Sequence, residues 1–200
     1  MNEKQRKRII DKHRDSFTRH GYHPCALYWS GKDIQDIRFQ VSADIGIQDG
    51  DSILDVGCGF GDFKCWAEKK ELTLDYTGID LSPDLLAEAE KRHPDAKFLE
   101  GDLFDMTFEN ENFDWVILSG ALNEQLNDKS AYAKRVIQRM YRLCRKGVAF
   151  NMLDGRYLQA HDLHSQNPEY MLRYCQDLQA KCELHDDYLK NDFSIYMYRA

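Results

Sequence analysis

The stretch LDVGCGFGD at residues 54–62 begins within the apolar run 52–56, continues as a glycine-rich loop and leads into a helical pattern. A chain that leaves a strand, turns sharply and enters a helix needs residues without a Cβ at the turn, and such a loop can keep its backbone N–H groups open to a ligand. Asp80 ends the next apolar run, about 20 residues further on, where a carboxylate can accept hydrogen bonds from two ribose hydroxyls. The pattern predicts an α/β fold with a nucleotide-type cofactor site.

The spacing of the glycines argues against a dinucleotide. A dinucleotide-binding loop has the pattern G-x-G-x-x-G, in which the third glycine allows close packing of helix and strand. Here the third glycine, Gly61, comes one residue early, and Asp62 follows it. A carboxylate at the start of a helix repels a pyrophosphate but tolerates a ligand that carries ammonium and sulfonium charges.

Apolar runs alternate with helical patterns along most of the chain, which implies a mainly parallel sheet covered on both faces. Ser82 and Pro83 form a good helix start, with a hydroxyl cap and a proline at the first helical position. The final two runs, joined by residues 188–192, are typical of an antiparallel hairpin. Strands are expected at 52–56, 73–79, 96–99, 113–118, 147–152, 181–187 and 193–199, and helices at 3–19, 33–47, 63–70, 83–92, 128–145 and 168–180.

Composition narrows the class of protein. A chain of 200 residues with 42% hydrophobic content suits one α/β domain. The net charge of −7 argues against a broad nucleic-acid-binding face, and the basic runs 4–8 and 134–146 are interpreted as solvated helix faces and dipole-complementing cations. The first 19 residues hold no continuous apolar segment, so a cytoplasmic protein without membrane contact is expected. The cysteines show no metal-ligand spacing, and His161 and His164 lack companions at such spacing, so no metal is expected.

The loop resembles the first motif of the class I S-adenosylmethionine-dependent methyltransferases. Two later stretches extend the resemblance, GDL at 101–103 after the third strand and NFDWVILS at 112–119 as the fourth, so that it covers residues 45–154 by motif order. The resemblance implies a single-domain Rossmann-like fold, with a mostly parallel seven-stranded sheet, a C-terminal antiparallel hairpin and helices on both faces. It further implies a cofactor-binding domain at 48–200 and an N-terminal helical lid at 1–47.

The same resemblance implies S-adenosylmethionine as the cofactor and assigns roles around it. Asp55 would hold the ammonium, unless its carboxylate binds the loop's own N–H groups. Asp80 would bind the ribose, unless it is simply an acidic cap of the next helix. Arg38 would pair with the methionine carboxylate and Trp29 or Tyr28 would face the sulfonium, unless these residues only pack. The complete set of expected cofactor-binding residues is Trp29, Arg38, Asp55, Gly57, Cys58, Gly59, Asp80, Leu81, Asp102, Leu103 and Ser119.

Methyl transfer from a sulfonium is an in-line displacement that mainly requires alignment and exclusion of water, so no catalytic residue is assigned. Where the acceptor is an alcohol or acid, a base such as Glu124, His185 or Asp186 would help. The residues expected to bind the acceptor substrate are Asn123, Glu124, Asn151, His185 and Tyr188.

The chain is therefore expected to methylate a small molecule at an oxygen or nitrogen nucleophile. The fourth strand lacks the Asn/Asp-Pro-Pro-Tyr/Phe ending of adenine and glutamine methyltransferases, and no cysteine follows the fourth or fifth strand to attack cytosine C5. Three alternatives stay open: an RNA or protein methyltransferase that uses the basic run 134–146, a non-catalytic S-adenosylmethionine-binding module, and, more distantly, a nicotinamide oxidoreductase.

Overall fold

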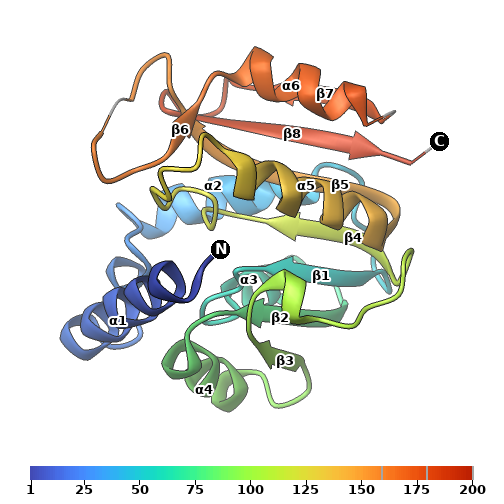
Figure 1. Cartoon of the computed structure of the whole chain (residues 1–200). Coiled ribbons are helices and arrows are strands. Elements are labelled where there is room, and N and C mark those ends of the chain that lie inside the picture. Colours follow the sequence, from blue (N-terminus) through green and yellow to red (C-terminus); the bar gives the residue numbers. More distant parts are fainter. Residues whose placement is uncertain (159, 179, 200) are drawn as a thin grey trace.

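A single mixed sheet organises the chain in the computed structural model, which describes residues 1–158, 160–178 and 180–199 (Figure 1). The strand order is β3-β2-β1-β4-β5-β8-β7, and the order reverses between β1 and β4. The first five strands pair in parallel, whereas β8 runs antiparallel to both β5 and β7. The strands are β1 (Ser52–Val56), β2 (Asp75–Asp80), β3 (Lys97–Glu100), β4 (Phe113–Leu118), β5 (Cys144–Asp154), β6 (Ser165–Gln166), β7 (Lys181–His185) and β8 (Asp192–Tyr198).

Helices cover both faces of the sheet because alternate strand residues point to opposite sides. In Figure 1, α5 lies in front of the sheet and α2 behind it, while α1 lies beyond the left-hand strand ends. Leu54 and Val116 belong to the core under α5 and α6, and their neighbours Ile53 and Trp115 belong to the core under α2 and α3. The helices are α1 (Glu3–His20), η1 (Pro24–Leu27), α2 (Lys32–Ala43), α3 (Asp62–Lys69), α4 (Pro83–Arg92), η2 (Leu103–Asp105), α5 (Ala131–Leu143) and α6 (Pro168–Asp177).

The predicted fold class is confirmed, including the C-terminal hairpin. Several predicted bounds differ from the observed ones by a few residues, the helix predicted at 33–47 ending at Ala43, and three further differences concern the elements themselves. The two-residue strand β6 pairs with β5 and was not expected, because so short a run carries no periodic signal. The strand β5 begins at Cys144, directly after α5, so the predicted helix end at 145 is too late. The Ser82 hydroxyl does not cap α4 but is buried without a partner, and the Ser82 N–H donates to the Asp80 carboxylate.

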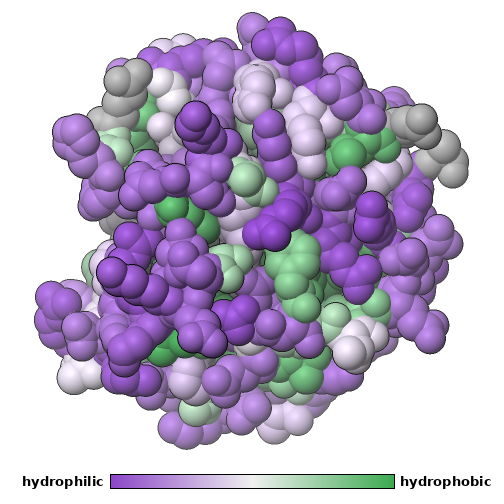
Figure 2. Space-filling model, viewed as in Figure 1, coloured by the Kyte–Doolittle hydropathy of each residue, from purple (hydrophilic) through white to green (hydrophobic). Residues whose placement is uncertain are grey.

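The surface of the molecule is mainly hydrophilic, with several separate hydrophobic patches in the view of Figure 2. None of the helices in the described ranges combines the length and apolarity that a membrane-crossing helix requires.

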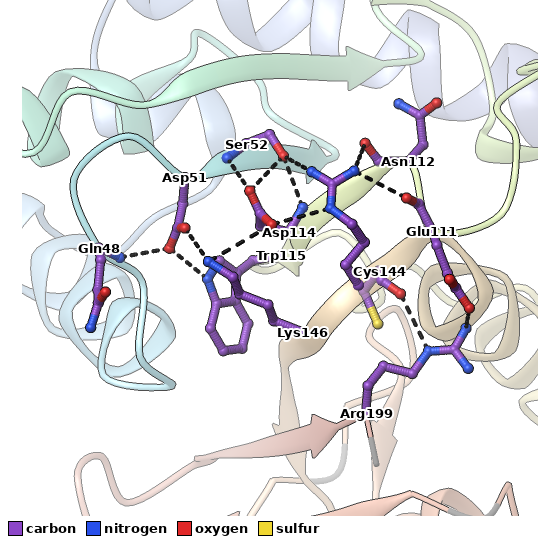
Figure 3. A network of polar contacts seen from close by, with 11 residues as sticks. Gln48, Asp51, Ser52, Glu111, Asn112, Asp114, Trp115, Cys144, Lys146 and Arg199 are labelled. Carbon is purple, nitrogen blue, oxygen red and sulfur yellow. Dashed lines mark hydrogen bonds and ion pairs between the residues drawn. The ribbon is translucent and has the colours of Figure 1, made fainter.

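A polar network ties together the amino-terminal ends of β1, β4 and β5 (Figure 3). The Asp114 carboxylate accepts hydrogen bonds from the N–H and the hydroxyl of Ser52, at 3.0 and 2.9 Å, and from Arg145 Nε at 3.2 Å. The carboxylate of Asp51 also accepts two hydrogen bonds, one from Lys146 Nζ and one from the indole N–H of Trp115. The last cations of the basic run 134–146 therefore pair within the protein, at the edge of the sheet that lies away from the strand carboxyl ends.

This network predicts a loss of stability in acid. Burial raises the pKa of Asp114, but the hydrogen bonds from Arg145 and Ser52 outweigh it and lower the pKa to about 2, from an ordinary 3.8. A carboxyl whose pKa is lowered by folding stabilises the protein above its unfolded pKa, and that contribution disappears as the pH falls from about 4 to 2. We expect Asp114→Asn to reduce the free energy of unfolding by about 1–2 kcal/mol at pH 7. Urea unfolding at pH 7 and pH 3 checks this, because the difference from wild type should shrink at pH 3.

Asp162→Asn provides the control, because Asp162 is exposed. Equal urea midpoints for wild type and Asp114→Asn at pH 7 would contradict the role given to the network.

Candidate functional site

A cavity of about 470 Å³ lies at the carboxyl ends of the parallel strands, beside the point where the strand order reverses between β1 and β4. In open α/β sheets this crevice is the place where ligands bind. Residues of α1, α2 and the loops after β1, β2, β3 and β4 line it. The lining includes every residue that the sequence predicted for the cofactor, namely Trp29, Arg38, Asp55, Gly57, Cys58, Gly59, Asp80, Leu81, Asp102, Leu103 and Ser119.

The backbone N–H groups of the glycine loop are already bonded within the protein. Gly57 and Cys58 donate to the carbonyl of Ile79 at 2.8 and 3.0 Å, and Gly59 donates to Asp80 Oδ2 at 2.9 Å. The prediction that these N–H groups stay open to a ligand is therefore wrong. The end of β2 uses them to fix the loop after β1, so the loop is not an anion-binding nest of the kind that holds a pyrophosphate.

The glycines are needed because other segments approach the loop closely. Gly57 has a φ of +77°, and a Cβ there would lie 2.4 Å from the Ala121 Cβ in the segment after β4. Gly59 has a φ of +56°, and its Cβ would lie 2.9 Å from Leu27 Cδ1 in η1. Both positions thus combine a left-handed backbone with a steric limit, and they bring the β4 loop and the N-terminal segment to the cavity.

Asp80 has a structural task in addition to its predicted one. Its Oδ2 accepts from the Gly59 N–H and its Oδ1 from the Ser82 N–H, each at 2.9 Å. A carboxylate has about four acceptor positions, so two remain for a ligand at this cavity-lining residue. The alternative interpretation of Asp80, an acid next to a helix start, is thus compatible with ligand binding.

Asp55 is buried at the end of β1, and its partner is the hydroxyl of Tyr76, 2.6 Å from Oδ2. The alternative partner considered from the sequence, the loop's own N–H groups, is not the one observed. Burial raises the pKa of Asp55 to about 7, assisted by the nearby Asp80 and Asp62, although the Tyr76 hydrogen bond lowers it. A cation that binds here would favour the ionised carboxylate.

Asp62 occupies the first position of α3, where a helix dipole would otherwise favour an anionic ligand. Its carboxylate is buried and accepts hydrogen bonds from the Tyr22 hydroxyl at 2.8 Å and from Gln35 Nε2 at 2.9 Å. Both donors belong to the N-terminal segment, which is thereby tied to the loop after β1. The structure places the Asp62 carboxylate at this helix end, where a negative charge would repel a phosphate group.

Arg38 and Trp29 form one wall of the cavity from α2 and the segment before it. The Arg38 Nε donates to the buried carboxylate of Asp192 in β8, and the Arg38 Cζ lies 4.8 Å from the centre of the Trp29 ring. Burial raises the pKa of Asp192 to about 6, against the lowering effect of Arg38. The remaining guanidinium donors leave the predicted pairing with a ligand carboxylate open, whereas the Trp29 ring already has a cation against it.

The remaining cofactor-site candidates are held rigidly. Asp102 Oδ1 accepts from the Phe104 N–H at 3.1 Å, and Oδ2 accepts from the Tyr132 hydroxyl at 2.9 Å. Leu103 is buried next to it. The Ser119 hydroxyl accepts from Asn151 Nδ2 at 3.0 Å. These contacts fix the loop after β3 and the end of β4 before any ligand binds.

Of the residues expected to bind the acceptor, some line the main cavity and the others lie elsewhere. Asn123 and Glu124 line the cavity. Asn151 does not, because it is fully buried behind the end of β4, where it accepts from the Gly120 N–H at 2.9 Å. His185 and Tyr188 line a second cavity, of about 290 Å³, beside the hairpin. The two hairpin residues expected to bind the acceptor, His185 and Tyr188, are therefore not part of the lining of the main cavity.

The structure adds two histidines that the sequence analysis missed or set aside. His13 of α1 and His164 of the loop before β6 both line the main cavity. No spacing could have revealed them, because they come from opposite ends of the chain and meet only through the tertiary fold. Glu124, proposed as a base, pairs with Lys12 of α1.

Comparison with known proteins agrees with this geometry. Residues 53–147 match the family model described as a methyltransferase domain. A phthiotriol/phenolphthiotriol dimycocerosates methyltransferase of Mycobacterium leprae is 39% identical over 70 residues, which cover 34% of this chain and 26% of that protein. The putative methyltransferase Rv1506c of Mycobacterium tuberculosis is 27% identical over 161 residues, which cover 74% of this chain and 93% of that protein.

Among solved structures, the magnesium protoporphyrin IX methyltransferase of Synechocystis PCC 6803 with bound S-adenosylmethionine superposes with a TM-score of 0.69. Its sequence identity is 17%, and the alignment covers 98% of this chain and 97% of that one. The likeness shows a shared fold over the whole length.

Proposed function

We propose that this chain, which belongs to the class I S-adenosylmethionine-dependent methyltransferases, transfers the methyl group of S-adenosylmethionine to a small-molecule acceptor.

The observation that carries the proposal is the chemistry of the loop after β1. Its N–H groups are bonded to Ile79 and Asp80, and a carboxylate stands at the start of α3. Such a loop disfavours the pyrophosphate of a nicotinamide dinucleotide but suits a ligand with ammonium and sulfonium charges. The cavity lining around this loop includes Asp55 and Asp80, whose carboxylates can accept from an ammonium group and from ribose hydroxyls, so the residues fit the cofactor.

We assign the ribose hydroxyls to the free acceptor positions of Asp80 and the ammonium to Asp55. Leu81 and Leu103 would cover the adenine, and Asp102 would accept from its amino group. Bound S-adenosylmethionine supplies a methyl carbon to a nucleophile, and the C–S bond breaks with its electron pair remaining on sulfur. The task of the protein is to hold the acceptor in line and to exclude water.

A small acceptor suits the volume and the enclosure of the cavity. Its 470 Å³ is near the lower end of the range of ligand pockets, about 300–1,000 Å³. The basic residues that would favour RNA are engaged elsewhere: Lys134 lies over the rings of Tyr170 and Tyr174, and Arg145 pairs with Asp114. Because these basic side chains are already engaged, we favour a small-molecule acceptor over an RNA substrate.

Transfer of a labelled methyl group tests the acceptor class. We expect protein incubated with methyl-labelled S-adenosylmethionine and a cell extract to place the label in the low-molecular-weight fraction. Label in RNA or protein would instead support the macromolecular alternative, and protein that binds S-adenosylmethionine without transfer to any fraction would be a non-catalytic module.

We also propose that residues 1–47 serve as a lid, as the family resemblance implied. Ion pairs attach α1 to η2, to the first turn of α4 and to the segment after β4. Arg6 pairs with Asp105 at 2.6 Å, Arg14 pairs with Asp84 at 3.0 Å, and Lys12 pairs with Glu124. Release of these pairs would expose the cavity, because Ile9, Lys12 and His13 of α1 are part of its lining.

Removal of the Lys12 pair is expected to loosen the lid. Lys12→Ala should weaken S-adenosylmethionine binding about fivefold, since a part-buried ion pair contributes about 1 kcal/mol. Calorimetry and hydrogen exchange of residues 3–20 measure the two effects. Lys7→Ala is the matched control, because Lys7 is exposed and pairs only within α1, with Asp11 at 3.5 Å. If Lys12→Ala left both the hydrogen exchange of residues 3–20 and the affinity for S-adenosylmethionine unchanged, the proposal that residues 1–47 form a lid would be refuted.

A further inference from the structure

Three side chains that line the main cavity have a buried polar atom without a hydrogen-bond partner. These atoms are His13 Nδ1, Asn123 Oδ1 and His164 Nε2. Buried polar atoms in proteins are nearly always satisfied, so three exceptions around one cavity call for a partner that is not part of the chain. None of the three has a task in binding the cofactor as assigned above.

The three side chains are brought together by one short segment, residues 123–124. The backbone N–H of His164 donates to the backbone carbonyl of Asn123 at 2.8 Å, and Leu163 forms an isolated antiparallel bridge with Glu124. From the other side, Lys12 of α1 donates to Glu124, and the adjacent His13 is near enough to the Glu124 carboxylate for that charge to raise its pKa. This segment follows β4, directly across the strand reversal from the glycine loop, so these atoms border the acceptor end of the site.

Both rings are neutral at physiological pH and so offer an acceptor nitrogen. Burial lowers the pKa of His164, against a raising effect of Asp128. Burial also lowers the pKa of His13, against the raising effects of Asp80, Glu124 and a hydrogen bond to the Ala26 carbonyl, while Lys12 lowers it further. We assign the tautomers in which His13 Nδ1 and His164 Nε2 are the acceptor nitrogens, so that together with the Asn123 oxygen the site presents three acceptor atoms without donors.

The charge of the lining favours a cationic acceptor. In the part of the chain that the structure describes, the cationic side chains of the lining are Lys12 and Arg38, and both are already paired, with Glu124 and Asp192. Lys12 is neutralised by Glu124, and the remaining guanidinium donors of Arg38 are those predicted to pair with the cofactor carboxylate, so a carboxylate substrate would have to compete for them. Six carboxyl side chains stand in the lining, namely Asp55, Asp62, Asp80, Asp102, Glu124 and Asp128.

We propose, on the basis of the methyltransferase function above, that the acceptor is a small amine with an apolar body, which enters as an ammonium ion. An ammonium has N–H donors and no acceptor, which matches the unpartnered atoms. Asn123 Oδ1 and His164 Nε2 hold two of its hydrogens, and His13 Nδ1 receives the proton whose loss frees the nitrogen lone pair. Apolar residues of the lining, Ile34, Leu153, Leu158 and Leu163, receive the body of the molecule.

The proton balance is simple. The ammonium gives one proton to the neutral imidazole, which yields a neutral amine and an imidazolium. Desolvation in the cavity lowers the pKa of the amine, and the carboxylates of Asp80 and Glu124, which already raise the pKa of His13, stabilise the imidazolium. Lys12 opposes this effect, while the ring of Tyr28 packs edge-on against His13 with centroids 5.6 Å apart. The imidazolium then returns its proton to solvent.

Binding of matched probes tests the proposal without turnover. Calorimetry on protein saturated with S-adenosylhomocysteine should show that phenethylamine binds at least about tenfold more tightly than the alcohol and the carboxylate of the same frame. Imidazole nitrogen shifts of His13 should move toward the imidazolium values when the amine is added. Tighter binding of 2-phenylethanol or 3-phenylpropionate, or binding of no amine by protein that does bind S-adenosylhomocysteine, would overturn the proposal.

His13→Gln tests the proton step, because glutamine keeps a hydrogen-bonding side chain but cannot take the proton. Its kcat/KM with the amine should fall about 100-fold at pH 7 and recover most of that loss at pH 10, where the free amine is abundant. A purely structural role would give a loss that does not depend on pH. Exposed His161 provides the control, and His161→Gln should behave as wild type. The affinity for S-adenosylmethionine should be the same in both variants as in wild type. If wild-type protein did not bind S-adenosylmethionine at all, the proposed function itself would be refuted.

Discussion

Alanine at position 57 is expected to weaken S-adenosylmethionine binding at least about 100-fold, a loss near 3 kcal/mol. The added Cβ would lie 2.4 Å from the Ala121 Cβ, so the loop after β1 and the segment after β4 must move apart. The left-handed φ of +77° adds about 1–2 kcal/mol of backbone strain. Calorimetry with the cofactor measures the loss, and thermal unfolding reports how much of it is a general loss of stability.

Two matched variants separate the steric effect from the strain. Gly50 has a φ of +84°, and a Cβ added there would have nothing within 4 Å, so Gly50→Ala carries strain alone and should bind the cofactor normally. Ala121→Gly removes the atom that collides, so the double variant Gly57→Ala/Ala121→Gly should recover much of the affinity. Binding by Gly57→Ala that equals wild type would show that the loop does not approach the ligand.

Loss of the Asp80 carboxylate is expected to be at least as severe. Asp80→Ala removes the acceptor of the Gly59 and Ser82 N–H groups as well as the proposed ribose contacts. Each hydrogen bond to a charged group contributes about 1.5–3 kcal/mol, so we expect cofactor affinity to fall about 100- to 1,000-fold. Titration calorimetry measures this, and Asp80→Asn should lie between alanine and wild type because the amide keeps one acceptor oxygen.

Asp75, an exposed acid at the start of the same strand, supplies the control. Asp75→Ala leaves the strand end intact and should bind S-adenosylmethionine as wild type does. An Asp80→Ala variant with the affinity of Asp75→Ala would remove Asp80 from the site.

The features that the sequence predicted are those encoded by local pattern. The strand, the turn and the helix around Gly57 follow from residue types within one segment, and the bounds of β1, β4 and α4 agree with the prediction. Asp80 could be placed because the carboxyl ends of neighbouring parallel strands share one edge of the sheet. Every predicted cofactor residue accordingly lines the cavity.

The features that the sequence could not predict depend on contacts between distant segments. Strand register brings the Ile79 carbonyl to the Gly57 N–H, which closes the loop against anions. The connection between β7 and β8 places Tyr188 in the lining of the second cavity and not in that of the main one. Asn151 sits on the predicted strand, but its side chain supports the end of β4 instead of facing a substrate. His13 reaches the site only because α1 crosses the cavity rim.

Binding of S-adenosylmethionine by the purified wild-type chain is the most direct test of the account. Isothermal titration calorimetry with S-adenosylmethionine, S-adenosylhomocysteine and NAD⁺ in parallel should show saturable heat for the first two ligands and none for the third. No heat with S-adenosylmethionine, or saturable binding of NAD⁺ in its place, would contradict the claim that the loop at Gly57 and the Asp80 carboxylate form a site for a cationic nucleoside.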